Sequence, residues 1–103
     1  MKKENYYIYK IVNNEKKFVE VSGYTESFDG IKIGFHKNEY QKWVRTELST
    51  GLSIGLTFGT KKAAVESVTP ELITMVANLL KNSEAVKEAQ QKLKKFKEAK
   101  ISN

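Results

Sequence analysis

The chain has no cysteine, a single histidine, His36, and a single aspartate, Asp29. The missing cysteines exclude thiolate metal sites, thiol catalysis and disulfide bonds, and they fit a reducing cytoplasm. Most of the acidic residues lie singly, without the close repeated spacing of a carboxylate metal site. No nucleophile motif accompanies His36, which we interpret as an exposed strand histidine. We therefore expect no metal, no cofactor and no enzymatic activity, and only a well-formed pocket around His36 would favour an enzyme.

Long apolar runs are also absent, since no window approaches the roughly 18 residues that cross a bilayer. The N-terminal segment Met1-Lys-Lys-Glu-Asn is not followed by the apolar stretch of a secretory signal. We therefore expect a soluble cytoplasmic protein without a membrane partner. With 103 residues, 40% of them hydrophobic, the chain is long enough for one domain with its own core.

Positive charge dominates and is unevenly spread. The chain carries 18 basic and 12 acidic residues, which gives a net charge of +6. Seven lysines and three glutamates lie within residues 81–100, so most of the excess belongs to the C-terminal segment. Every basic residue except Arg45 is a lysine, and lysine supplies diffuse charge in place of the bidentate contacts of arginine. The composition favours attraction to a polyanion over the reading of base sequence.

The first half of the chain has the pattern of antiparallel strands. Aromatic and β-branched residues are concentrated in short runs, and turn residues such as Asn13 and Asp29-Gly30 separate them. Polar residues 23–30 are predicted to connect the second strand to the third. Short connections predict a meander of four or five antiparallel strands within residues 5–58. The predicted strands are residues 6–12, 17–22, 31–36, 41–48 and 52–58.

Strand alternation ends before residue 60, and helical spacing follows. Thr60 is predicted to cap a short helix over residues 61–67. Thr69 and Pro70 are a typical start for a second helix. Apolar residues then recur at three- and four-residue spacing, which predicts a helix that faces the core, at Leu72, Ile73, Val76, Leu79 and Leu80.

The C-terminal segment is harder to place from its pattern. Residues 83–103 keep only a thin apolar stripe among lysines, so they are predicted to project or pack loosely, with the last three residues frayed. Asn82 and Ser83 either separate two helices or lie within one. The fold class is therefore α+β: a single domain, residues 1–103, whose helical part (residues 60–100) covers one face of an antiparallel sheet.

Two lysines, Lys61 and Lys62, begin the first predicted helix, where unpaired backbone N–H groups attract anions. The segment Lys61-Lys-Ala-Ala64 resembles the Lys-Lys-x-Ala motif that follows the last strand of double-stranded-RNA-binding domains. The resemblance implies that both lysines contact backbone phosphates, although this chain lacks that family's first helix and has two extra strands. With Lys92 and Lys95 of the basic segment, they are the candidate nucleic-acid- or anion-binding residues; the other interpretation is that all four are merely solvated.

A second resemblance spans roughly residues 5–68. The pattern Trp43-Val-x-Thr-Glu-x-Ser-Thr-Gly-Leu-x-Ile, followed by Thr60-Lys-Lys-Ala-Ala-Val, is similar to small uncharacterised proteins of phages and integrative elements from low-GC Gram-positive bacteria. The lysine- and asparagine-rich, cysteine-free composition is similar too. The resemblance implies an accessory role in a mobile element, acting on host defence or DNA metabolism, and it identifies no active residues.

Aromatic residues are the candidates for a partner interface. Strand alternation places Tyr6 on the face of Lys10, which predicts that Tyr6 is open to solvent while Tyr7 and Tyr9 belong to the core. Tyr6, Trp43 and Phe96 are accordingly predicted to bind a partner, as interface anchors. Tyr6 could alternatively stack on bases.

These patterns lead to two functional expectations. The first is a non-catalytic protein-interaction module or inhibitor that acts on a host nucleic-acid enzyme or defence complex. The alternative is direct nucleic-acid binding through the lysine-rich helix start and the basic C-terminal helix. The apolar stripe around Phe96 could also join two copies of the chain as a homodimer.

Overall fold

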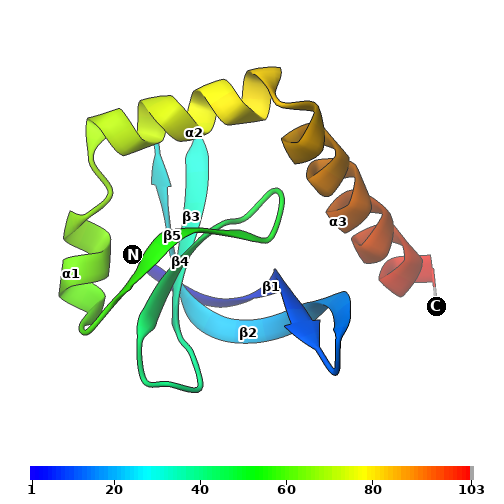
Figure 1. The fold of residues 1–103 in the computed structure, drawn as a ribbon, viewed down its shortest axis with the longest axis horizontal. Coiled ribbons are helices and arrows are strands. Elements are labelled where there is room, and N and C mark those ends of the chain that lie inside the picture. Colours follow the sequence, from blue (N-terminus) through cyan, green and yellow to red (C-terminus); the bar gives the residue numbers. More distant parts are fainter. Residues whose placement is uncertain (103) are drawn as a thin grey trace.

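The computed structural model describes residues 1–102, in which five strands are followed by three helices (Figure 1). This confirms the predicted α+β class with an antiparallel meander. The strands are β1 (Lys2–Val12), β2 (Glu15–Phe28), β3 (Ile31–Lys37), β4 (Trp43–Glu47) and β5 (Leu52–Phe58), and the helices are α1 (Lys61–Glu66), α2 (Pro70–Asn82) and α3 (Glu84–Ser102).

Neighbouring strands pair in chain order, β1-β2-β3-β4-β5, and every pair is antiparallel. The first hairpin turns at Asn13 and Asn14 (φ 53° and 66°), and the second turns at Asp29 and Gly30 (φ 51° and 82°). Two successive positive φ angles match the right-handed twist of the strands. Because the second turn needs only two residues, β2 continues to Phe28, and the predicted connection over residues 23–30 is wrong.

The sheet curls strongly, so its first strand reaches its last hairpin. The backbone N–H of Tyr9 in β1 donates to the carbonyl of Gly51, between β4 and β5, at 2.8 Å. The curl gives the sheet an outer face, which carries Ile33 and Phe35, and an inner face, which carries Gly34 and His36.

Helices cover the outer face. Ile33 and Phe35 are completely buried beneath α1 and α2, where they pack with Ala64, Ile73 and Val76. Both helices begin as predicted, because the Thr60 hydroxyl accepts from Ala63 N–H at 3.1 Å and the Thr69 hydroxyl accepts from Leu72 N–H at 3.2 Å. Each bond satisfies one backbone donor at a helix start.

Helix α3 covers the same face farther along β1 and β2. Leu93 is only 1% exposed, and the Phe96 ring lies 5.1 Å from the rings of both Tyr7 and Phe18. Strand register places these two rings on the side of Phe35. The prediction that this segment projects or packs loosely is therefore wrong. The few apolar side chains of α3 pack against the first hairpin, where Phe96 contacts its aromatic rings.

Ser83 separates α2 from α3. Of the two alternatives that the sequence left open, one continuous helix or two helices, the structure has two. The backbone of Ser83 is extended (φ −88°, ψ 119°), and its hydroxyl accepts from Val86 N–H at 3.3 Å. Helix α3 then continues through Ser102, although the sequence predicts fraying from residue 101. Residue 103 lies outside the described residues.

Candidate functional site

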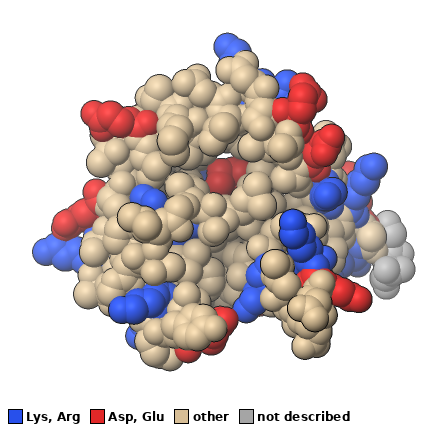
Figure 2. All heavy atoms as spheres, viewed as in Figure 1, with Lys and Arg blue, Asp and Glu red and all other residues tan. Residues whose placement is uncertain are grey.

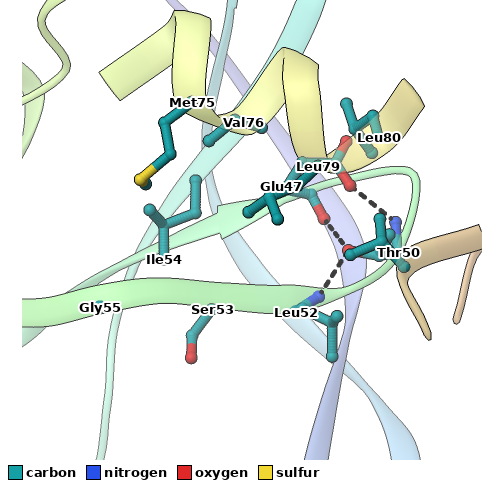
Figure 3. A pocket seen from close by; sticks show the side chains of 11 residues that line it. Glu47, Thr50, Leu52, Ser53, Ile54, Gly55, Met75, Val76, Leu79 and Leu80 are labelled. Atoms are coloured by element: carbon teal, nitrogen blue, oxygen red, sulfur yellow. Dashed lines mark hydrogen bonds between the residues drawn. The ribbon is translucent and has the colours of Figure 1, made fainter. Parts of the chain in front are cut away.

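A groove lies between α2 and the β4–β5 hairpin (Figure 3). It encloses a cavity of about 210 Å³. Its walls are mostly apolar, with Thr50 and Ser53 as uncharged polar residues: the hairpin supplies Leu52 and Ile54, and the helices supply Met75, Val76, Leu79, Leu80 and Val86. The two exposed apolar side chains on its rim, Met75 and Leu79, are 50% and 46% accessible.

The one charged residue that lines this groove is Glu47, at the end of β4. It is 6% exposed. Its carboxylate accepts hydrogen bonds from Ser49 N–H at 2.9 Å, from Ser49 Oγ at 2.9 Å and from Thr50 N–H at 3.0 Å. The turn is tied to α3 as well, because Gln90 Nε2 donates to Ser49 Oγ at 2.9 Å. Glu47 is thus held in one position by the turn that follows it.

No lysine or arginine nitrogen in the described chain lies within 4.0 Å of the Glu47 carboxylate. Arg45 shares its face of β4 but is engaged elsewhere: Nη2 donates to Ile54 O at 2.8 Å, and Nη1 donates to Ser67 Oγ at 3.0 Å. A buried charge is normally paired. Glu47 therefore gives the groove a fixed negative charge that only hydrogen bonds offset.

The groove can accept a group with two parts, an aliphatic stem and a cationic head. Figure 2 shows a hollow near the middle of this face with acidic atoms inside it, surrounded by uncharged surface. The apolar walls favour a hydrocarbon chain, and the carboxylate favours a cation that donates hydrogen bonds. Lysine and arginine side chains combine both features.

The four candidate lysines do not form one site. Lys61 Nζ lies 3.9 Å from the centre of the Tyr24 ring, and Lys62 Nζ lies 3.9 Å from Glu66 Oε1. Both belong to α1, whose six residues are separated from α3 by the length of α2 (Figure 1). Lys92 and Lys95 are exposed on α3. The fold therefore divides the predicted anion-binding set between opposite sides of the molecule.

The predicted partner-binding aromatics are used mainly in internal packing. Tyr6 is 8% exposed, so the prediction that it is open to solvent is wrong. The curl of the sheet buries the inner face at Tyr6 and leaves it more exposed at Lys10. Strand alternation shows only that the two residues share a face, and it cannot predict this difference in burial. Trp43 is half-buried against the core, 6.4 Å from Tyr24, and Phe96 packs on the first hairpin. Tyr7, which was expected in the core, is half-buried and packs against the ring of Phe96.

His36 is 6% exposed, which corrects its interpretation as a solvent-facing histidine. It lies on the inner face, where Tyr6 is its aromatic neighbour at 6.2 Å. Burial lowers its pKa below the usual 6.5, and Lys10 lowers that pKa further. No cluster of three or more potential metal-ligating side chains occurs among residues 1–102.

Sequence reasoning missed Glu47, although a signal was present. Glu47 precedes the run Ser49-Thr-Gly51 at the spacing that lets its carboxylate accept the next free backbone N–H groups. The sequence predicted the helix α2 but not its position beside this turn, where its side chains line the groove together with Glu47 (Figure 3).

Scans against protein-family models, curated proteins and solved structures found no match for this chain. Within the described residues no helix is long and apolar enough to cross a membrane. Function must therefore be inferred from the groove itself.

Proposed function

We propose that this chain is a non-catalytic protein-binding module whose groove between α2 and the β4–β5 hairpin receives a lysine or arginine side chain of its partner. The observation that carries the proposal is the Glu47 carboxylate, which is buried in an apolar groove without a cationic partner among the described side chains.

The free energy that an ion pair with Glu47 contributes depends on whether the two charges are exposed or buried. An exposed ion pair contributes about 0–1 kcal/mol, whereas losing one partner of a desolvated, hydrogen-bonded pair costs about 2–5 kcal/mol. Glu47 is only 6% exposed in the free protein, so most of the desolvation on binding is that of the incoming cation. The rim residues Met75 and Leu79 then cover the aliphatic stem and exclude water from the pair.

The resemblance to accessory proteins of phages and integrative elements supports a host nucleic-acid enzyme or defence complex as the source of the partner. Such enzymes present basic side chains on the surfaces that bind phosphates. A module that accepts one of those side chains would compete with nucleic acid for its partner and act as an inhibitor.

A peptide-display selection on the immobilised full chain tests the proposal directly. Selected peptides should share a lysine or arginine, and replacing it by norleucine should weaken binding at least tenfold, about 1.4 kcal/mol. Glu47→Gln should weaken binding similarly while circular dichroism stays unchanged. Selection of peptides without a basic residue would contradict the proposal.

Two leucine-to-aspartate variants, one on the rim of the groove and one outside it, test where the partner binds. Leu79→Asp places a carboxylate on an exposed edge of the groove and should block the stem of the bound side chain. Leu56→Asp makes the same change at a residue that is 75% exposed and does not line the groove, so affinity should be retained. Equal effects of both changes would place the interface elsewhere.

A further inference from the structure

The inner face of the sheet encloses a second cavity, whose lining shares only Ser53 with that of the groove. Its volume is about 190 Å³. Its polar lining includes His36, Thr46 and Ser53, and its apolar lining includes Ile8 and Val44. It forms because the Tyr9–Gly51 hydrogen bond holds β1 against the β4–β5 turn.

The polar side chains of this face are incompletely satisfied. His36 Nδ1, Thr46 Oγ1 and Tyr6 OH are buried without a hydrogen-bond partner among the described residues. Their residues are 6%, 1% and 8% exposed. Folded proteins pair nearly all such groups. Two of these three groups belong to residues that line the cavity, where a ligand or an ordered water molecule would complete their hydrogen bonds.

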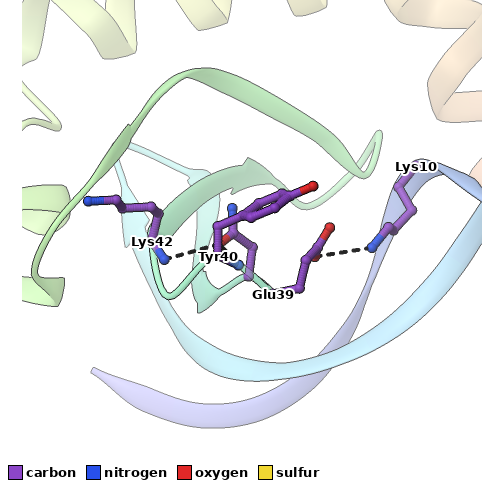
Figure 4. Close-up of polar contacts among 5 residues, drawn as sticks. Lys10, Glu39, Tyr40 and Lys42 are labelled. Carbon is purple, nitrogen blue, oxygen red and sulfur yellow. Dashed lines mark hydrogen bonds and ion pairs between the residues drawn. The ribbon is translucent and has the colours of Figure 1, made fainter.

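An ion pair spans the mouth of this cavity. Lys10 Nζ lies 3.5 Å from Glu39 Oε2 (Figure 4), and both side chains are partly exposed. The loop that carries Glu39 is rigid, because Asn38 Oδ1 accepts from Tyr40 N–H at 2.9 Å and from Lys42 N–H at 3.0 Å. Exposed pairs of this kind contribute little stability, so Lys10 can exchange Glu39 for another anion at small cost.

We propose that the inner cavity binds a small organic carboxylate: its negative group replaces Glu39 as the partner of Lys10 and approaches His36 and Thr46, while its apolar part lies on Ile8 and Val44. This site lies on the opposite face of the sheet from the groove, and it does not depend on the proposed function.

The charges that face the imidazole favour an anion. They are Lys10 from β1 and Glu39 from the β3–β4 loop, and the phenol of Tyr6 is a further titratable neighbour. Lys10 depresses the pKa of His36 more than Glu39 raises it, so the local field is positive. An anion in the cavity would reverse this balance, raise the pKa of His36 and bind more tightly as pH falls.

His36 does line a cavity, which is the feature named above as favouring an enzyme, but its imidazole is not arranged for catalysis. No hydrogen bond joins His36 to a hydroxyl or a carboxylate anywhere in residues 1–102. A histidine that activates a nucleophile is held within hydrogen-bond reach of it and oriented by a third group. The imidazole therefore serves as a recognition group.

His36 is the only histidine, so its imidazole NMR signals report on this cavity without ambiguity. Acetate, butyrate and benzoate should each shift these signals saturably and raise the measured pKa of His36. Butyrate and benzoate should bind more tightly than acetate because Ile8 and Val44 receive their apolar parts. Glu39→Gln should tighten binding roughly two- to five-fold, since it removes the competing partner of Lys10.

Lys10→Gln should abolish the saturable shift. Lys42→Gln is the matched control, because Lys42 lies on the same loop as Glu39 but points away from Lys10 (Figure 4), and it should leave binding unchanged. Leu79→Asp should also leave it unchanged, which separates this site from the groove. Shifts that stay linear with concentration, or that persist in Lys10→Gln, would overturn the proposal.

Discussion

The ring of Tyr6 lies directly over Gly34, so closely that a Cβ on Gly34 would be 2.5 Å from the Tyr6 Cζ atom. This contact fixes how tightly β1 folds over β3. It also makes the inner face a packed interior at one end and a cavity at the other. Residue 34 must be glycine because the ring occupies the space of any side chain.

Gly34→Ala should therefore destabilise the protein, by about 1–3 kcal/mol or more, because the ring or the strand must move. Urea unfolding followed by tryptophan fluorescence measures the loss. Gly59→Ala is the control, since no atom lies within 4 Å of a Cβ at that position. Similar midpoints for both variants would show that the Tyr6 ring yields easily.

Arg45→Lys should be destabilising although it keeps the charge. The guanidinium donates twice to Ile54 O, from Nε at 3.2 Å and from Nη2 at 2.8 Å, and it also reaches Ser67. A lysine cannot reproduce this fork, and charge-assisted hydrogen bonds contribute about 1.5–3 kcal/mol each. Thermal unfolding should show a clearly lower midpoint, with Lys62→Arg on the exposed face of α1 as the control.

Stability should fall when the pH drops below about 6.5. Burial, followed by Lys10, lowers the pKa of His36 in the folded state below 6.5. The unfolded chain then binds more protons than the folded one, so the stabilisation is complete above 6.5 and decreases as pH falls toward the folded-state pKa. Urea midpoints at pH 7.5, 6.5 and 5.5 should show this decrease, and His36→Gln should flatten it. A wild-type curve without slope would mean that His36 titrates normally.

A second acid transition should come from Glu4. Its pKa is lowered to about 2, chiefly by Lys32 at 2.7 Å and by the Thr25 hydroxyl at 2.9 Å. This contribution to stability is present above the ordinary pKa of 4.5 and is lost as pH falls toward 2. Glu4→Gln should remove the part of the acid transition between these values, whereas Glu20→Gln, at an exposed position, should not.

Direct nucleic-acid binding predicts a salt dependence of affinity that differs from that of partner binding in the groove. If Lys61, Lys62, Lys92 and Lys95 contacted phosphates together, affinity for a duplex would fall steeply and log-linearly with salt. Their separation on α1 and α3 predicts only weak binding that Lys61→Glu with Lys62→Glu leaves nearly unchanged. Fluorescence anisotropy at two salt concentrations measures both properties. A steep slope that the double variant abolishes would favour the nucleic-acid alternative.

Local signals in the sequence were sufficient for the hairpins and helix starts. Asn13-Asn14 and Asp29-Gly30 adopt the positive φ angles that such pairs favour, and Thr60 and Thr69 act as caps, because each depends on neighbouring backbone alone. The length of β2 was missed because its polar residues 23–27 were interpreted as a loop. In a curled sheet polar side chains can face solvent or, like Thr25, the packed inner face without ending the strand.

The candidate sites could not be derived in the same way. Alternation shows that Tyr6 and Lys10 share a face, but closure of β1 onto Gly51, far along the chain, decides which end of that face is buried. Glu47 lines a groove only because α2 lies beside the turn that follows it. Leu93 and Phe96 lie among lysines in the sequence, yet Leu93 is 1% exposed and Phe96 packs on the half-buried rings of Tyr7 and Phe18. Each outcome depends on contacts between distant segments.

The extended backbone of Ser83 has a consequence for whether two copies of the chain exchange their C-terminal helices. If that residue became helical, residues 70–102 would form one rod of about 50 Å at 1.5 Å per residue, longer than the 37 Å greatest dimension of the folded chain. Phe96 would leave the rings of Tyr7 and Phe18, and only the same rings on a second molecule could replace them. A single non-helical serine thus keeps the C-terminal helix on its own sheet and disfavours exchange of that helix between copies.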